Sequence, residues 1–319
     1  MIPRIQFAHL PTSIEPLPRL TKKMNGPQLL VKRDDQTGLA FGGNKTRKLE
    51  FLVAEAQARG AGTLLSAGAL QSNHCRQTAA AAARFGFACT LVLVGEPPAQ
   101  ASANLLLDQL FDARIIWTDK LHRDEALQTA FDAAVAHGEK PYLVPYGGSN
   151  STGALGYVFA MQEFMDQGIQ ADWIVFASSS GGTQAGLVLG ARLFDFPGKV
   201  LGISVDEPRD VLQARVAKLA SETSERLGSH TDFVAQDVLV NADYATHGYG
   251  VLTGLEREAI QLFARNEGLL LDPVYTGRAA AGLIDLIRKG FFKKEERVLF
   301  WHTGGQPALF AEQYQKGLP

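Results

Sequence analysis

A lysine stands at an unusually pliable place in the sequence, within the stretch "FGGNKTRKLE" at residues 41–50. Two glycines and an asparagine come directly before Lys45, and Arg47 and Lys48 follow it. The glycines allow close backbone approach, and the segment after them is expected to be a helix whose first N–H groups have no partners. A solvent-facing helix start would explain this lysine. A lysine that reaches a ligand and reacts with it is the alternative.

A second candidate for chemistry is the run of small residues in "WIVFASSSGGTQAGL", residues 173–187. An apolar strand is expected to lead into Ser180, Gly181, Gly182 and Thr183, after which a helix begins. Hydroxyls and backbone amides at the beginning of a helix form an anion cradle, and phosphate is its usual ligand. A tight turn with ordinary caps is the alternative. The spacing matches neither a nucleotide P-loop nor the dinucleotide fingerprint.

A third junction, "LLSAGALQSNHCRQ" at residues 64–77, leads from an expected strand into an expected helix. Either Ser72 or Asn73 could cap this helix through a side-chain oxygen, and capping alone would explain the presence of either one. His74 and Cys75 have no partner pair at metal-ligand spacing. We therefore predict no metal site here.

Two late segments each place a hydroxyl residue beside glycines just after an expected strand. They are "DPVYTGRA" at residues 272–279, with Tyr275, and "FWHTGGQPALF" at residues 300–310, with Thr303. Each alone would pass for a loop. Together with the phosphate cradle and the reactive lysine, they suggest a phosphorylated cofactor held by an imine. Pyridoxal phosphate meets that description, because its aldehyde needs a lysine amine and its phosphate needs a helix start.

These junctions must be positioned by alternating strands and helices, and the sequence contains both. Apolar segments rich in β-branched residues predict strands at 28–32, 63–67, 89–95, 113–118, 141–146, 173–178, 199–205, 268–272 and 297–303. Alanine-rich periodic segments predict helices at 76–85, 100–111, 123–137, 154–167 and 255–266. This alternation indicates an α/β protein with parallel sheets covered on both faces, and the number of strands favours two sheets. The glycine-rich turn at 146–156 is the best candidate for a crossing between two domains.

The composition is that of an ordinary globular protein and excludes several function classes. The chain has 319 residues, of which 46% are hydrophobic and 20% charged, and its formal net charge of -2 gives no reason to expect a nucleic-acid or membrane-surface partner. Two cysteines are too few for a disulfide framework. There is neither a secretory signal pattern nor an uninterrupted apolar run of about 18 residues. We expect a soluble cytoplasmic protein.

The motifs resemble those of one known family. The strings "KRDDQTGLAFGGNKTRKLEFL", "GALQSNHCRQTAAAAARFG", "SSSGGTQAGL", "DPVYTGRA" and "HTGGQPALF" are similar, in this order, to the D-cysteine desulfhydrase and 1-aminocyclopropane-1-carboxylate (ACC) deaminase family. That family belongs to the tryptophan-synthase-β-like, fold type II pyridoxal phosphate enzymes. The resemblance runs from about Phe7 to Phe310 and so covers nearly the whole chain.

The resemblance implies a role for each matching residue. Lys45 looks like the lysine that binds the cofactor covalently and later moves protons, and Lys48 looks like a phosphate contact. Asn73 resembles the asparagine that hydrogen-bonds the ring hydroxyl, and Ser72 the serine that faces the substrate carboxylate. The family's phosphate loop matches Ser180, Gly181, Gly182 and Thr183. Its two active-site tyrosines match Tyr249 and Tyr275, and its partner of the pyridine nitrogen matches Thr303.

The family fold implies two open, mostly parallel domains with α/β/α layers. A large cofactor-binding domain at residues 1–48 and 155–319 would be interrupted by a small domain at residues 49–154. The family also implies a homodimer, which nothing in the sequence alone demonstrates.

The resemblance favours β-elimination from D-cysteine, giving pyruvate, ammonia and sulfide. ACC deaminases of this family carry a glutamate directly after the active-site tyrosine, where this chain has Thr276. A threonine hydroxyl cannot keep the ring nitrogen protonated as a carboxylate does, so ACC deaminase ranks third. L-cysteate sulfo-lyases, which share the opening "FAHLPTSIEPLPRL", rank second. A protein that binds pyridoxal phosphate without catalysis is the alternative of another class.

Overall fold

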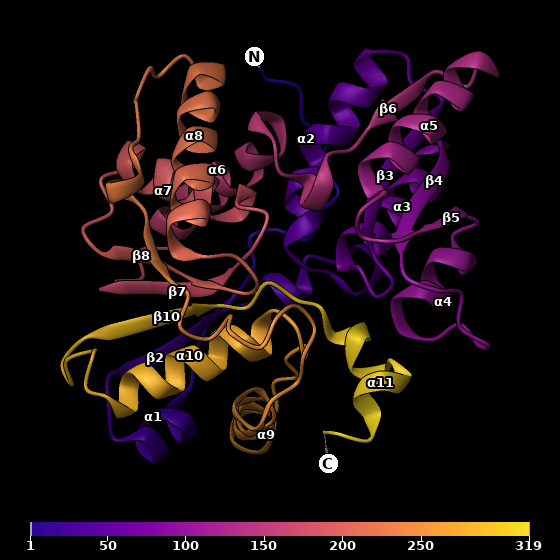
Figure 1. Ribbon diagram of the computed structural model, residues 1–319. Coiled ribbons are helices and arrows are strands. Elements are labelled where there is room, and N and C mark those ends of the chain that lie inside the picture. The colour runs from indigo at the N-terminus through magenta and orange to yellow at the C-terminus, as the bar shows by residue number, and fades with distance from the viewer. Residues whose placement is uncertain (1, 319) are drawn as a thin grey trace.

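The computed structural model describes residues 2–318 and contains two sheets, each covered by helices (Figure 1). The larger sheet is parallel except at one edge, where its first strand runs antiparallel to the second. The smaller sheet is parallel throughout. In spatial order the larger sheet consists of β1 (Ile14–Pro16), β2 (Gln28–Lys32), β10 (Arg297–Trp301), β7 (Trp173–Ser178), β8 (Lys199–Ser204) and β9 (Leu239–Asn241). The smaller sheet consists of β5 (Arg114–Thr118), β4 (Ala88–Val94), β3 (Thr63–Ala69) and β6 (Pro141–Leu143).

Helices lie on both faces of each sheet, as Figure 1 shows most clearly for the larger one. One face of the larger sheet packs against α1 (Pro18–Met24), α9 (Gly254–Glu267) and α10 (Thr276–Arg288). Its other face packs against α6 (Ser151–Asp166), α7 (Gly182–Leu193) and α8 (Arg209–Leu227). The smaller sheet lies between α5 (Arg123–Ala136) on one side and a layer of α2 (Asn44–Ala58), α3 (Asn73–Phe85) and α4 (Ala103–Leu110) on the other. The remaining elements are the short helix α11 (Glu312–Gln315) and the 3-10 turns η1 (Asp34–Gln36), η2 (Leu39–Phe41), η3 (Tyr146–Gly148), η4 (Ala235–Asp237) and η5 (Gln306–Phe310).

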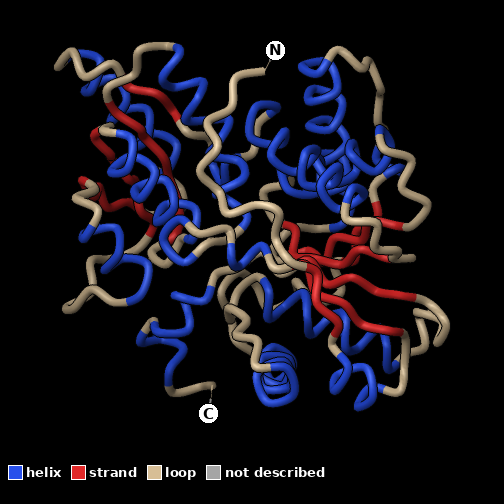
Figure 2. The backbone as a smooth tube through the Cα atoms, turned by 180° about the vertical axis from the view of Figure 1, so that it is seen from behind, coloured by secondary structure: helices blue, strands red, loops and turns tan. Residues whose placement is uncertain are grey.

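Strand β10 shows why the larger sheet is covered twice. Val298 and Phe300 belong to the core beneath α9 and α10, whereas Leu299 and Trp301 belong to the core beneath α6 and α7. Successive side chains of a strand point to opposite faces, so the run of apolar residues from Val298 to Trp301 buries both faces. The predicted α/β class with two mostly parallel sheets is confirmed, and the two sheets are visible as two separate groups of strands in Figure 2.

Several predicted element boundaries are wrong. Residues 268–272 form no strand: Leu269 and Leu271 are buried and Leu270 is exposed, but this extended segment packs against the helical layer and pairs with no strand. The predicted strand at 141–146 ends at Leu143, shortly before a proline that has no N–H to donate. The glycine-rich segment at 146–156 is a turn only up to Asn150, whose side chain caps α6.

Helices α2 and α6 lie side by side where the chain passes from one sheet to the other and back. Gly156 of α6 packs directly against the backbone carbonyl of Arg47 in α2, so a side chain at this position would collide with the neighbouring helix. Strands before α2 and after α6 belong to the larger sheet, and all strands between them belong to the smaller one. The strands are therefore divided as the predicted domains require, while the boundaries at 48/49 and 154/155 stay a prediction.

A buried ionic cluster fixes the beginning of α2 on the larger sheet. Both carboxylate oxygens of Asp34 accept hydrogen bonds from the Arg47 guanidinium at 2.8 Å. Asp34 also accepts from the Tyr157 hydroxyl at 2.6 Å and from the Trp301 indole N–H at 2.8 Å. Burial alone would raise the pKa of Asp34, but Arg47 above all lowers this pKa to about 2. The cluster ties α2, α6 and β10 together two residues away from Lys45.

Among residues 2–318, no helix combines the length and the apolar character needed to cross a membrane.

Candidate functional site

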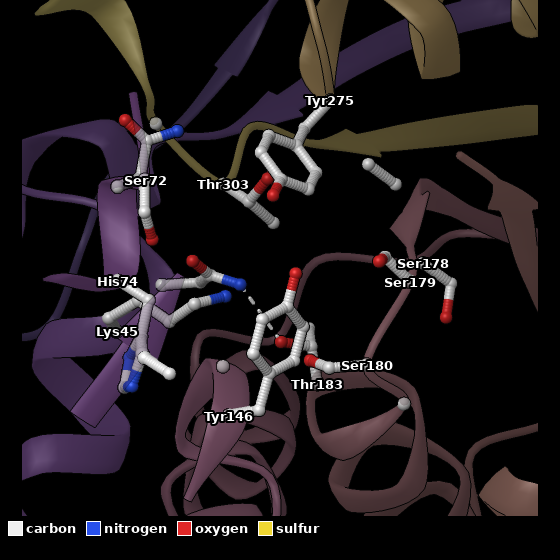
Figure 3. A pocket seen from close by; sticks show the side chains of 17 residues that line it. Lys45, Ser72, His74, Tyr146, Ser178, Ser179, Ser180, Thr183, Tyr275 and Thr303 are labelled. Carbon is white, nitrogen blue, oxygen red and sulfur yellow. Dashed lines mark hydrogen bonds between the residues drawn. The ribbon is translucent and has the colours of Figure 1, made fainter. Parts of the chain in front are cut away.

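A pocket lies where α2, α3, α7 and α10 all begin, between the two sheets. Its walls come from the first turns of these helices, from the ends of β3 and β7, and from the loop after β10, and Figure 3 shows its side chains. Helix N-termini carry unpaired N–H groups and a partial positive charge, so four of them around one cavity favour an anionic ligand. Of the residues predicted from the sequence, the pocket is lined by Lys45, Ser72, Asn73, Ser180, Gly181, Thr183, Tyr275 and Thr303.

Lys45 belongs to the first turn of α2 and points into this pocket (Figure 3). The loop before it is held against the opposite wall, because the N–H of Asn44 donates to the Thr303 carbonyl at 3.0 Å. Gly43 has a φ of 121°, and a Cβ there would lie 3.1 Å from the same carbonyl oxygen. Burial lowers the pKa of Lys45 to about 8; Arg76 lowers this pKa further, whereas Asp272 acts in the opposite direction. The neutral, nucleophilic amine is thus accessible near neutral pH.

Lys48 lies one turn later, behind the pocket wall rather than on it. Its ammonium donates to the Gly147 carbonyl at 3.1 Å and to the Ser149 hydroxyl at 3.2 Å, both neutral partners. Burial and the nearby Lys45 lower its pKa well below the usual value. Within residues 2–318, neither lysine forms a salt bridge. An anionic ligand beside these two buried lysines would stabilise their protonated forms.

The beginning of α7 has the form of an anion cradle. No side chain of its own N-cap closes this helix, and its first amide, that of Gly182, donates to the Ser149 hydroxyl at 3.1 Å. That hydroxyl lies 2.8 Å from the Ser180 hydroxyl, and the Asn44 amide donates to the Thr183 hydroxyl at 2.9 Å. A Cβ on Gly182 would lie 2.6 Å from the Ser149 oxygen, so the cradle has room only for glycine here. The hydroxyls, the helix start and the two lysines fit a phosphate group.

Ser72 and Asn73 begin α3 on the opposite wall. The Ser72 hydroxyl oxygen accepts from the Cys75 N–H at 3.1 Å and so caps the helix. Its own O–H donates to no other group among residues 2–318. Asn73 lines the pocket beside it. The capping that the sequence predicted for Ser72 or Asn73 is therefore supplied by Ser72.

Tyr275 lies at the N-cap of α10, and its hydroxyl reaches the pocket. The Tyr249 hydroxyl is 2.7 Å from that of Tyr275, so Tyr249 acts on the pocket through Tyr275 and does not line it. Burial raises the pKa of both phenols, which keeps them neutral. Arg278 holds the loop around Tyr249 by donating to the carbonyls of Gly248 and Val251 at 2.8 Å each.

Thr303 lines the pocket, whereas Thr276 does not. The Thr276 hydroxyl donates to the Asp272 carboxylate at 2.7 Å and accepts from the Asp272 N–H at 2.8 Å. Thr276 is thus engaged in the cap of α10, and Thr303 is the hydroxyl that remains available. The predicted strand before Tyr275 is absent from the structure, so an aspartate cap and not a strand end positions this tyrosine.

Sequence reasoning missed Tyr146, and it considered His74 only as a metal ligand. Tyr146 lines the pocket from the turn before α6, and the Arg123 guanidinium lies 4.8 Å from the centre of its ring. The His74 ring contacts the Ser66 hydroxyl at 2.9 Å, and burial together with Lys45 and Lys48 lowers its pKa well below the usual value. His74 is therefore neutral. No group of three or more potential metal ligands occurs among residues 2–318.

Comparisons with known proteins agree with this geometry. Residues 5–304 match the family model described as "Pyridoxal-phosphate dependent enzyme". A crystal structure of an ACC deaminase homologue is 36% identical with a TM-score of 0.91, over 99% of this chain and 95% of the other. An L-serine ammonia-lyase from the fungus Rhizomucor miehei is 17% identical with a TM-score of 0.71, over 98% of this chain and 100% of the other. The processed form of threonine deaminase isoform 2 from Solanum lycopersicum is 16% identical with a TM-score of 0.65, over 92% of this chain and 79% of the other.

Proposed function

Because the chain belongs to the family of pyridoxal-phosphate dependent enzymes, we propose that it catalyses β-elimination from a small amino acid, with D-cysteine as the substrate. The overall reaction is D-cysteine and water to pyruvate, ammonia and sulfide. The cofactor is pyridoxal 5'-phosphate. The observation that carries the proposal is the neutral pair Tyr249 and Tyr275 at a pocket that also holds Lys45.

Lys45 holds the cofactor and moves the proton at Cα. When bound, pyridoxal phosphate holds the substrate amine covalently and takes up the negative charge that develops at Cα. The pKa of about 8 supports both functions of Lys45, because the neutral amine is the nucleophile and also the base. Ser180, Gly181, Gly182 and Thr183 hold the phosphate together with the charge of Lys48, and Thr303 serves as the partner of the ring nitrogen.

Ser72 orients the substrate through its carboxylate. The hydroxyl oxygen is occupied by the Cys75 N–H, so the O–H proton is directed to another acceptor. The beginning of α3 adds a partial positive charge at the same place. A carboxylate bound here lies on the wall opposite the cradle for the phosphate.

The tyrosine pair supplies the proton for the leaving group. A thiolate leaves more readily when a neighbouring acid protonates it, and a neutral phenol is such an acid. The hydrogen bond between the two hydroxyls allows Tyr249 to restore the proton that Tyr275 gives up. A protein that only bound the cofactor would need the cradle and the lysine but no such pair.

The charge of the pocket favours cysteine over cysteate. Among the described residues that line it, Lys45 is the one cationic side chain, and the cofactor occupies this lysine. A sulfonate would therefore meet no dedicated counter-ion. ACC is disfavoured because Thr276 replaces the family glutamate and is bound to Asp272. L-cysteate remains the second candidate and ACC the third.

We also propose a cytoplasmic homodimer with a large domain at residues 1–48 and 155–319 and a small domain at residues 49–154. The division of the strands between two sheets supports the domains, and the family resemblance supports the dimer. Sedimentation equilibrium would test the dimer, because a monomer would sediment with a mass of 34.5 kDa.

The substrate is tested by incubating the purified holoenzyme with D-cysteine, L-cysteine, L-cysteate and ACC in parallel. Pyruvate and sulfide in equal amounts from D-cysteine alone are the expected result. Sulfite from cysteate or 2-oxobutyrate from ACC, with no reaction of D-cysteine, would move the activity to the second or third candidate. A bound cofactor with no keto acid from any of them would favour the non-catalytic binder.

A further inference from the structure

Arg76 is a buried cation that the proposed mechanism does not use. It lies in the first turn of α3 and has no solvent exposure. Its guanidinium donates to three neutral oxygens: those of the Asn104 side chain at 2.9 Å, the Asn73 side chain at 3.3 Å and the Gly42 carbonyl at 3.0 Å. None of the salt bridges among residues 2–318 includes it. A buried guanidinium whose hydrogen bonds go to amides indicates a role in orienting them.

The contacts of Arg76 determine the orientation of two side-chain amides. Arginine can only donate, so the Asn104 atom that it contacts must be the oxygen. The Asn104 nitrogen therefore points the other way, where it donates to the Gln71 carbonyl at 2.9 Å and to the Asn73 side chain at 2.9 Å. The Asn73 atom that receives these bonds from Arg76 and Asn104 must be its oxygen.

The Asn73 nitrogen is thereby directed away from Arg76. It lies beside Gly305, where a Cβ would come within 2.8 Å of it, and it has no protein acceptor among the described residues. Asn73 lines the pocket, so the free N–H₂ group is available to a ligand. Reversing the Asn73 amide would place two donors, the N–H₂ groups of Asn73 and Asn104, face to face and would lose the bond from Arg76.

Arg76 also contacts the loop that carries the lysine. The Gly42 carbonyl that it binds is three residues before Lys45, and the Gln77 side chain donates to the same carbonyl at 2.5 Å. One guanidinium thus connects the loop before α2 with the asparagine at the beginning of α3. The two groups expected to contact adjacent substituents of the cofactor ring, its aldehyde and its hydroxyl, share one anchor.

We propose that Arg76 and Asn104 are positioning residues that fix the Asn73 amide with its N–H₂ group toward the pocket. The acceptor on the cofactor is the ring hydroxyl oxygen, so the inference rests on the proposed role of Asn73 in the pyridoxal phosphate site. Asn104 comes from α4 and Arg76 from α3, and neither residue lines the pocket. Arg76 and Asn104 contribute only the direction of the hydrogen bond that the Asn73 N–H₂ group donates.

The substitution Asn104→Asp tests the direction of this bond. The new carboxylate keeps the size of the side chain and gains a charge partner in Arg76, but it can donate neither to the Asn73 oxygen nor to the Gln71 carbonyl. Asn73 then turns its N–H₂ group toward the carboxylate and presents an oxygen to the pocket. We expect the Kd of the apoprotein for pyridoxal phosphate to rise about tenfold or more, with little change in thermal unfolding of the apoprotein. Asn266→Asp, at a hydrogen bond to the Leu262 carbonyl in α9, is the matched control and should leave the Kd unchanged.

A double-mutant cycle separates positioning from a general structural effect. In an Asn73→Ala background the directed donor is already absent, so Asn104→Asp should add almost nothing to the loss of affinity. Equal losses in both backgrounds, or an unchanged Kd in a folded Asn104→Asp protein, would overturn the proposal. If Asn104→Asp does not fold, Arg76→Lys replaces it in the same double-mutant cycle. Lysine keeps the positive charge but lacks the planar guanidinium whose two nitrogens donate to Asn104, Asn73 and Gly42. Cofactor titration uses no substrate, so its result is independent of whether D-cysteine is the substrate.

Discussion

The hydroxyl oxygens of Tyr249 and Tyr275 lie 2.7 Å apart although 26 positions separate the two residues in the chain. Their rings meet edge to face at an angle of 73°. Tyr275 begins α10, and Arg278, one turn later in the same helix, donates to the backbone on both sides of Tyr249. A single helix therefore positions both phenols, one directly and the other through an arginine.

Replacing Tyr275 by phenylalanine should impair protonation of the leaving group. We expect kcat/KM for D-cysteine to fall about a hundredfold, because general acid catalysis typically contributes at least this much. Tyr249→Phe removes only the second member of the relay and should have a smaller effect. Sulfide release at saturating and limiting substrate measures both variants.

A substrate with a better leaving group is the control for the tyrosines. Chloride leaves without a proton, so 3-chloro-D-alanine should react with Tyr275→Phe nearly as fast as with the unmodified enzyme. An equal loss of rate with both substrates would show that Tyr275 has another function, such as holding the substrate in place.

Replacing Lys45 by alanine should abolish covalent attachment of the cofactor and turnover together. Borohydride reduction of the holoenzyme followed by peptide mass analysis should find the cofactor on Lys45. Lys48→Ala, at the neighbouring buried lysine, should keep that covalent bond while weakening cofactor affinity, because only an amine beside the cradle is lost. Cofactor found on Lys48 in the unmodified enzyme would refute the assignment.

The rate at which the apoprotein captures pyridoxal phosphate should depend on pH through Lys45. Burial depresses the pKa of this amine to about 8 from an ordinary value of 10.5, and only the neutral amine reacts. The rate constant should therefore rise about tenfold for each pH unit below about 8 and level off above it. Stopped-flow absorbance measures this profile. A rate that continued to rise in the same way to about pH 10 would indicate a lysine with an unshifted pKa.

Ionisation of Asp34 should make the free energy of unfolding depend on pH between about pH 4 and pH 2. Its pKa is lowered to about 2 from 3.8, so its ionised form stabilises the folded protein above about pH 4, and this contribution of about 2 kcal/mol is lost as the pH falls through about 2. Asp34→Asn should cost about 3 kcal/mol in the free energy of unfolding at neutral pH, because it leaves Arg47 without its closest partner.

Unfolding by denaturant at several pH values checks this prediction. The variant should lose the part of the pH dependence that lies between about pH 4 and pH 2, whereas Asp132→Asn, on the exposed side of α5, should retain it. An unchanged pH profile in Asp34→Asn would assign acid stability to other carboxylates.

The parts of the site that follow local rules could be predicted from the sequence. Glycines next to Lys45 and small residues around Gly181 mark places where a chain turns into a helix start, and these rules need no distant information. Their convergence on one pocket follows from parallel sheets, whose strands end at the same edge. A cap at Ser72 or Asn73 was predicted for the same reason, because capping is decided within one turn, and the structure shows which of the two supplies it.

Other parts depend on contacts between distant segments and could not be predicted. Residues 268–272 alternate in burial as a strand does, but no strand lies beside them, so they remain unpaired. Tyr146 lines the pocket because its turn packs between the sheets, and nothing in its local sequence indicates that position. The orientation of the Asn73 amide depends on Asn104, which is 31 residues later.

The packing of α2 against α6 affects which segment of the chain relatives could exchange as one unit during evolution. Because the two helices are neighbours, the segment between them leaves the larger sheet and returns to it at one place. Exchange of that whole segment between relatives would have to preserve the close contact of Gly156 with the Arg47 carbonyl. Such a cassette would bring a new wall at Ser72, the proposed carboxylate contact, to an unaltered Lys45 and an unaltered beginning of α7, and so would vary the substrate while preserving the covalent attachment of the cofactor.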